Sequence, residues 1–472
     1  MSAPSATTTS LERSALIVAV LTSFMGPFMI SSVNVALPTI QADFDLGAVQ
    51  LSWISTAYLL AVAVGLVPAG KVADIYGRKI VFVAGLFLYT IAVGGAAIAT
   101  SGGWLIGARV GQGLGAAMFV TTGMAIITSV FPPNRRGRVI GIYVAAVYIG
   151  LSAGPFFGGI ITQQFGWRAL FYLVFPFGVF LILLTLGYLK GEWRGEPGQR
   201  LDVAGCVLYG TALCCLVYGA TRLPSIIGAL LGGGGVILLI VFVRHQLRAS
   251  YPVFEVRLFA ANKTFAFSSL AALLNYSATF AVTFLLSLYL QYIKGMSPQS
   301  AGSILMAQPV MMALLSPVAG RLSDRIEPRL LATAGMSVTV VGVMFFIMID
   351  TATPVGLIVA NLIILGTGFA LFSSPNMSAI MGAVEQRLYG VASGAVATMR
   401  LLGQMASMAI ATVVLSLLIG SRAITPPLYD RFLDSLHLVF AISALLCSAG
   451  IYFSWFRGSL FDPENGKSEG EF

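Results

Sequence analysis

The sequence predicts an all-helical membrane protein with many spans, built from two similar halves. Hydrophobic residues make up 57% of the 472 residues, charged residues only 10%, and the mean hydropathy is +0.91. Apolar runs of ~20 residues, the length that crosses a bilayer, recur along the whole chain. A charged segment between two such runs returns about half a chain later. These observations exclude a soluble protein and an enzyme held by a single anchor.

Charged residues, Pro and Gly separate the apolar runs and predict about 14 helices, grouped as six, two and six. Polar, turn-rich residues at 190–202 and a basic stretch at 244–263 bracket the central pair. We therefore expect an N-terminal six-helix bundle (1–189), a linker with two extra spans (190–263), a C-terminal six-helix bundle (264–456) and a tail (457–472). The expected spans are 14–36, 51–69, 80–100, 104–130, 138–161, 168–189, 203–221, 225–243, 264–290, 299–319, 330–349, 354–382, 391–419 and 436–456.

The net charge of +9 comes from Lys and Arg on alternate loops. Nucleic acid would require one continuous basic stripe, whereas an excess of bases on the cytoplasmic side explains alternation. The sequence therefore predicts a multi-pass protein of the cell membrane with both termini in the cytoplasm. The bases of the cytoplasmic set are Arg13, Lys71, Arg78, Lys79, Arg135, Arg136, Arg138, Lys190, Arg194, Arg200, Arg244, Arg248, Arg257, Lys263, Arg321, Arg325 and Arg329.

The repeated segment is Gly70–Lys79 in the first half and Gly320–Arg329 in the second. Each copy starts with Gly, has Asp four residues on and ends in bases, so it must be a tight, water-facing turn. In the first copy Asp74 can pair with Arg78 one helical turn later.

The second copy keeps Gly320 and Asp324 but has Glu327 and Pro328 in place of Gly77 and Arg78, which predicts a weaker lock. The alternative is a pair of solvated loops with no gating role.

Small residues form a second pattern, in the fifth span. Gly150, Gly154 and Gly158 recur every four residues, and Pro155 removes a backbone donor there. Together with Gly159, they predict a close sliding or bending contact between the bundles. Ordinary packing of small residues is the alternative.

Two Arg residues lie inside apolar runs, Arg109 in the fourth span and Arg400 in the thirteenth. A charge at that depth is expensive and should face a cavity or an acid, and Gln112 adds a polar group beside Arg109. The alternatives are backbone carbonyls as partners of Arg109, and a place near a helix end from which Arg400 snorkels to water.

The repeated turn, the Arg109–Gly113 run and the Gly150–Gly159 run together resemble the major facilitator superfamily. The two extra central helices, with Asn34–Pro38 closing the first span, are similar to its fourteen-helix drug:proton antiporter branch. Later runs at 390–394 and 400–404 agree with that branch.

This resemblance implies two six-helix bundles that export small amphipathic compounds by alternating access. It implies a gate that stabilises the outward-open state at Gly70, Asp74, Gly77 and Arg78, and a role for Arg109 in proton movement and substrate binding. Because exporters of this family carry a similar glycine run, the resemblance favours efflux over uptake as the direction of transport. The expected partners are the substrate, membrane lipids and protons, the expected unit is a functional monomer, and no cofactor, metal or nucleic acid is expected.

Further uncharged residues in the spans are candidates for the substrate cavity, although ordinary interhelical hydrogen bonding can explain any one of them. They are Met29, Ser32, Asn34, Tyr143, Tyr148, Asn275, Tyr276, Tyr289, Gln291, Gln308, Asn361 and Asn376.

One position departs from the branch that the chain resembles. Met29 stands where such exporters usually have Asp, and no Asp or Glu lies in the middle of an expected span. Either a loop acid such as Asp43, Asp45, Asp74 or Asp350 serves proton coupling, or the protein is an uncoupled facilitator. A cavity with Arg109 and no counter-acid favours neutral or anionic amphiphiles, including lipid-like compounds and metabolites.

An enzyme embedded in the membrane is the alternative of another class. The sequence has no HExxH, no GxSxG and no GxxxxGK[ST] loop, and the four Cys all fall in apolar runs. We therefore expect no catalytic step and no ATP site.

Overall fold

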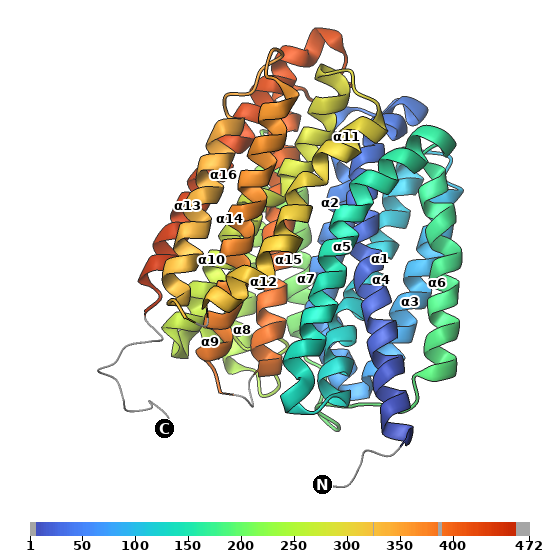
Figure 1. Cartoon of the computed structure of the whole chain (residues 1–472), viewed down its shortest axis with the longest axis vertical. Coiled ribbons are helices and arrows are strands. Elements are labelled where there is room, and N and C mark those ends of the chain that lie inside the picture. The colour runs from blue at the N-terminus through green and yellow to red at the C-terminus, as the bar shows by residue number, and fades with distance from the viewer. Residues whose placement is uncertain (1–5, 324, 386–388, 459–472) are drawn as a thin grey trace.

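The computed structural model describes residues 6–323, 325–385 and 389–458, and it consists of long helices joined by short connections (Figure 1). Fourteen helices in this part of the chain are long and apolar enough to cross a membrane, and no strand occurs there. The predicted all-helical polytopic fold is therefore confirmed. Both ends of the described chain lie at the same end of the molecule, the lower end in Figure 1, which we call the terminal end.

The helices form two groups separated by an inserted pair. The first group is α1 (Ala6–Phe44), α2 (Ala48–Tyr76), α3 (Arg78–Ala97), α4 (Gly102–Val130), α5 (Pro133–Phe165) and α6 (Arg168–Tyr188). The inserted pair is α7 (Val203–Thr221) and α8 (Ile226–Arg248), followed by the short α9 (Val256–Ala261). The second group is α10 (Lys263–Leu288) with its π-helical extension η1 (Tyr289–Ile293), α11 (Pro298–Leu305), α12 (Ala307–Ser323), α13 (Pro328–Phe346), α14 (Val355–Gly382), α15 (Tyr389–Leu418), the 3₁₀ turn η3 (Pro426–Leu428) and α16 (Tyr429–Phe456).

The repeated segment differs from its prediction as a tight turn. Helix α2 continues to Tyr76, so most of Gly70–Lys79 is helical, and only Gly77, with φ of 137°, breaks the backbone. A helix can extend past the apolar core because the charged residues of its last turns reach water or ion-pair partners. The turn between α2 and α3 therefore consists of one glycine, whose positive φ a side chain would strain.

The last predicted segment also needs correction. The expected tail begins at Arg457, but this side chain is 1% exposed and belongs to the packing of the second group. Its Nη1 donates to Asn376 Oδ1 at 2.7 Å and to Ser268 Oγ at 3.3 Å. Burial lowers the pKa of Arg457 to about 10, although nearby Glu327 acts in the opposite direction. Arg457 therefore joins the end of α16 to α10 and α14.

Glycine contacts show that the two halves share one packing plan. A Cβ added at Gly113 of α4 would lie 2.4 Å from the Tyr58 carbonyl oxygen of α2. A Cβ added at Gly366 of α14 would lie 2.5 Å from the Gln308 carbonyl oxygen of α12. The helix between the two members of each pair in chain order makes a similar contact: α3 meets α4, and α13 meets α14, through further glycines. These are Gly85 with Gly115 and Gly335 with Gly368.

The glycine run of α5 packs mainly inside the first group, which corrects the predicted contact between bundles. A Cβ at Gly150, Gly154 or Gly158 would meet α1, with the Phe24 carbonyl oxygen 2.6 Å from the first of these positions. Only Gly159 faces the other group, where its Cβ would lie 2.4 Å from the Pro298 carbonyl oxygen of α11.

The run therefore fixes the distance between α1 and α5. At the same level α11 approaches α5 closely through Gly302, whose Cβ would lie 2.0 Å from the Pro155 carbonyl oxygen.

The inserted pair lies beside the seam between the two groups. The Tyr209 hydroxyl of α7 donates to the Ala63 carbonyl of α2 at 3.1 Å, and the Ser416 hydroxyl of α15 donates to the Thr221 carbonyl at 3.3 Å. Asp202 caps α7 through Gly205 N–H and also bonds His245 at the end of α8. Partial burial raises the pKa of Asp202, but these hydrogen bonds outweigh it and hold the pKa below its ordinary value.

A pair of matched substitutions on α5 tests the close α1–α5 contact. We expect Gly154→Ala to destabilise the protein by about 1–3 kcal/mol, because the new Cβ would lie 2.8 Å from the Phe28 carbonyl oxygen, and backbone cannot rotate away. Gly141→Ala on the same helix meets nothing within 4 Å and should stabilise by about 0.5–1 kcal/mol through helix propensity. Thermal unfolding in detergent measures both, and shifts of the same sign would contradict this packing.

Candidate functional site

Hydrogen bonds between the two helix groups gather at the end opposite the termini. The Ser287 hydroxyl of α10 donates to the Asn34 carbonyl of α1 at 2.8 Å. One turn on, Gln291 Nε2 donates to the Val35 carbonyl at 2.9 Å. The first of these bonds satisfies the Asn34 carbonyl, which has no helical donor because Pro38, four residues on, lacks an N–H.

A second set of bonds joins α2 to α15 at the same end. Thr56 and Thr412 are fully buried, and their hydroxyl oxygens lie 3.1 Å apart. The Ala48 N–H donates to the Arg422 carbonyl at 2.8 Å, which brings the start of α2 against the loop after α15. We call these two sets the seal. They hold the groups together on the side away from the termini.

On the terminal side of the seal, polar side chains from both groups meet within the spans. The hydroxyls of Tyr148 on α5 and Ser373 on α14 lie 3.5 Å apart. Tyr276 on α10 interacts with both Ser373 and Arg400, and Arg400 on α15 lies close enough to Tyr143 to affect it electrostatically. We call these five residues the central cluster. It draws on four helices and on both halves of the chain.

The central cluster lies within the membrane-spanning helices, in the half nearer the terminal end. At 1.5 Å per residue, Arg400 is about 16 Å from the first residue of α15 and about 27 Å from its last. Arg400 therefore lies about three helical turns from the terminal end of α15. Tyr148, Tyr276, Ser373 and Arg400 are half-buried rather than buried, so a solvent-sized probe reaches them.

Arg109 is placed differently from its predicted cavity position. It is 1% exposed and lies inside the first group, where its Nε donates to the Ile54 carbonyl at 3.1 Å. Its Nη1 bonds Gln112 Oε1, and its guanidinium lies 4.4 Å from the centre of the Tyr58 ring. None of the ion pairs formed by the described residues includes Arg109. Neutral groups therefore satisfy this charge, as the backbone-carbonyl alternative expects.

The candidate residues of α1 lie in the packing of that helix. Met29 is fully buried. The Ser32 hydroxyl donates to the Gly154 carbonyl at 2.9 Å, and Asn34 Oδ1 accepts from the Ser55 hydroxyl at 2.8 Å. The structure places these side chains against α5 and α2 rather than beside the central cluster.

Most candidates in the second half also bond within their own group. Asn361 Nδ2 donates to the Gly342 carbonyl at 2.8 Å, and Asn376 Nδ2 donates to the Ser268 carbonyl at 3.0 Å. Asn275 and Gln308 are buried as well. Of the uncharged cavity candidates, Tyr143, Tyr148 and Tyr276 are the ones that the structure brings together. Sequence reasoning missed Ser373, whose only signal is a Ser-Ser-Pro run inside a span.

The first copy of the repeated segment forms the predicted ion pair. Arg78 Nη2 lies 2.7 Å from Asp74 Oδ1, and the same guanidinium donates to the Ala125 carbonyl of α4 at 3.2 Å. In the second copy Gly320 faces α14, since its Cβ would lie 2.9 Å from Ser374 Oγ. Gly70 faces α4 in the corresponding way, 3.0 Å from Thr121 Cγ2. Asp324 lies outside the described residues.

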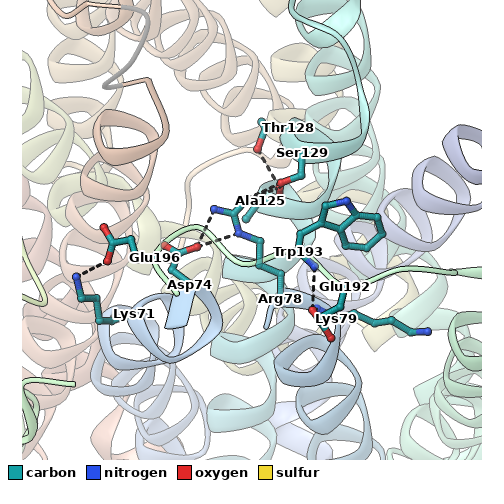
Figure 2. A network of polar contacts seen from close by, with 10 residues as sticks. All are labelled: Lys71, Asp74, Arg78, Lys79, Ala125, Thr128, Ser129, Glu192, Trp193 and Glu196. Atoms are coloured by element: carbon teal, nitrogen blue, oxygen red, sulfur yellow. Dashed lines mark hydrogen bonds and ion pairs between the residues drawn. The ribbon is translucent and has the colours of Figure 1, made fainter. Parts of the chain in front are cut away.

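The connection from α6 to α7 crosses this segment, as Figure 2 shows, and we call its residues 191–199 the strap. The Glu192 carboxylate accepts from the N–H groups of Lys79 at 2.8 Å and Ile80 at 3.2 Å. These are free donors at the start of α3, where helix geometry favours a negative charge. The Trp193 carbonyl accepts from Arg78 N–H at 2.9 Å.

The other half of the strap binds α2. Glu196 N–H donates to the Asp74 carbonyl at 2.9 Å, and its carboxylate pairs with Lys71 Nζ at 2.5 Å. Lys71 also donates to Gln199 Oε1 at 2.9 Å. The strap therefore holds the last turn of α2 and the first turn of α3 together (Figure 2). The sequence alone predicted a polar linker at 190–202, because its residues form no motif that indicates which helices it contacts.

Comparison with known proteins fits this architecture. The family model described as Major Facilitator Superfamily matches residues 19–408 and again 268–471. The chain belongs to the Major Facilitator Superfamily. The second match begins near the start of the second helix group, in agreement with the two similarly packed halves of this chain.

Two curated members of the superfamily are similar over most of their length. The riboflavin transporter RibZ of Clostridioides difficile is 31% identical over 390 residues, which cover 82% of this chain and 84% of that protein. The multidrug resistance protein Stp of Mycobacterium tuberculosis is 31% identical over 419 residues, covering 86% and 77%.

A solved major facilitator structure confirms the fold. A bacterial homologue of the human lysosomal transporter Spinster, in an inward-facing and unoccupied conformation, matches with a TM-score of 0.69. The alignment covers 96% of this chain and 98% of that one, at 16% sequence identity.

Limited proteolysis tests the strap. Arg194 is exposed within it, so trypsin cleaves there when the strap lifts off. We expect the double variant Glu192→Ala/Glu196→Ala to be cut roughly 30-fold faster, since losing the two carboxylates lowers the opening free energy by about 2 kcal/mol. Glu255→Ala, which removes an exposed carboxylate from the next connection, is the matched control. Equal cleavage rates in all three proteins would show that these carboxylates do not hold the strap.

Proposed function

We propose that this protein is a secondary transporter that exports small amphipathic compounds across the cell membrane by alternating access. One observation carries the proposal most directly. The central cluster takes side chains from both helix groups, lies within the membrane-spanning helices, contains partly exposed side chains, and is on the terminal side of the seal. A binding site between two bundles that separate alternately at each end has these properties.

The orientation of the protein follows from its basic residues. Arg78 and Arg244 lie near the terminal ends of α3 and α8, and Arg194 and Arg325 lie in connections at the same end. Under the positive-inside rule we place the terminal end in the cytoplasm. The seal then closes the outer side, and the central cluster is approached from the cytoplasm, as an exporter requires for loading.

The unit of function that we propose is a single chain. The central cluster and the seal are both assembled from the two halves of one polypeptide, so a second copy has nothing to add to them. Membrane lipids surround the outer faces of the bundles, where large apolar side chains such as Ile227 and Leu230 of α8 are exposed. We assign the protein transport of unchanged substrate and no catalytic step.

An uncoupled facilitator is the second candidate. The described carboxylates lie at helix ends or in connections, and Met29 replaces the usual acid of the first span. Asp43 is paired with Arg168 at 2.6 Å, and Asp74 with Arg78. Hydrogen bonds from Thr353, aided by Ala352, hold the pKa of Asp350 below its ordinary value despite some desolvation. None of these acids lies in the central cluster.

Flux in reconstituted vesicles decides between the candidates. An imposed pH gradient, and separately a sodium gradient, is applied to vesicles that hold the protein and a fluorescent amphipathic dye. For the exporter we expect saturable flux that one gradient drives beyond equilibrium by several-fold, and a collapsed gradient is the control. Saturable equilibration indifferent to both gradients supports the facilitator. Flux no greater than in protein-free vesicles, for every dye tried, would contradict both.

A further inference from the structure

Arg400 carries the only full charge of the central cluster. The residue is half-buried, and its backbone lies about 16 Å into α15. A full positive charge at this depth costs at least ~3 kcal/mol unless a counter-charge or water meets it. The groups around Arg400 therefore decide whether this charge is neutralised within the protein or is available to a ligand.

Neutral groups supply those surroundings. Tyr276 interacts directly with Arg400, Tyr143 is within electrostatic range of it, and Ser373 and Tyr148 complete the cluster. None of the ion pairs formed by the described residues includes Arg400. The positive charge is therefore not neutralised by a carboxylate within ion-pair distance in this part of the chain.

Arg109 provides an internal contrast. It is the other Arg inside a span, and it is sealed from solvent against Ile54, Gln112 and the Tyr58 ring. Arg400 instead remains accessible at the seam between the groups. One guanidinium is thus bound within the protein, whereas the other presents N–H donors to whatever enters between the bundles.

The chemistry of the cluster matches an anion. Guanidinium offers five donors in a planar fork that suits carboxylate, sulfonate and phosphate oxygens. The tyrosine and serine hydroxyls can donate further hydrogen bonds to the same oxygens. Phe369 is buried and packs edge-on against Tyr276, with 5.1 Å between the ring centres, so it supports the Tyr276 ring from behind.

We propose that the central cluster binds the negatively charged group of an amphipathic substrate, with Arg400 as its counter-ion and specificity-determining residue. This inference rests on the proposed transport function and narrows its substrate class to amphiphilic anions. The same arrangement disfavours cations, because a second positive charge would have to approach an unneutralised guanidinium in a region of low dielectric.

Three dansyl probes that differ in charge test the inference by binding. Dansylglycine carries a carboxylate, dansylamide is neutral and dansylcadaverine is a cation. Fluorescence titration of the purified full-length protein in detergent gives each affinity. We expect dansylglycine to bind at least 10-fold more tightly than dansylamide, and dansylcadaverine to bind most weakly.

Substitutions assign that preference to Arg400. Arg400→Gln should abolish the advantage of dansylglycine while changing the affinity for dansylamide less than about 2-fold, and Arg400→Lys should retain part of the advantage. Arg244→Gln, which removes an exposed charge from α8, is the matched control. Thermal unfolding shows whether Arg400→Gln is folded. If it is not, the affinities of Arg400→Lys for the three probes are compared instead.

Each outcome has one meaning. Preference for the cation, or an anion preference that survives Arg400→Gln, overturns the inference. Displacement of dansylglycine by phosphatidylglycerol supports the anion site and identifies a lipid phosphate as its ligand. Vesicle flux without charge selectivity contradicts the inference alone, whereas charge-selective binding without flux contradicts the transport function alone.

Discussion

The cost of a charge or an unpaired polar group in hydrocarbon governs this structure. It keeps the described carboxylates at the helix ends, where Asp74 and Asp43 pair with Arg78 and Arg168. It also gives the two Arg residues within spans different surroundings. Arg109 is satisfied by neutral groups inside one bundle, whereas Arg400 lies on a surface that solvent reaches. The position of the candidate site follows from this difference.

Close helix approach is the second requirement, because lipid supplies no hydrophobic force that drives helices together. Glycines meet this requirement in both halves, with Gly113 and Gly366 seating one helix on the carbonyls of another. Each half therefore holds its helices at short, fixed distances. The seal, by contrast, consists of a few hydrogen bonds between side chains and backbone, such as Ser287 to Asn34. Rigid halves joined by breakable contacts are suited to rocking about a central site.

Sequence reasoning recovered the properties that depend on composition and spacing. Hydropathy predicted the fourteen spans, the four-residue interval predicted the Asp74–Arg78 pair, and the repeated segment predicted two halves. The predictions were wrong where a contact depends on which neighbouring helix a given helix face packs against. Gly150, Gly154 and Gly158 face α1, and of the run only Pro155 and Gly159 meet the other bundle, while Asn361 and Asn376 bond inside their own group. Arg457 was placed in a tail because its partners, Asn376 and Ser268, are distant in sequence.

The strap connects the inserted helices to the packing of the N-terminal bundle. Residues 191–199 cap α3 and bind α2 before the chain enters α7, which itself touches α2 and α15. The insertion is thus bound at the turn between α2 and α3 and also at the seam between the bundles. A twelve-helix version cannot be made by cutting the chain wherever a span ends. The excision has to begin after Gln199, because the first residues of the apparent insert complete the N-terminal bundle.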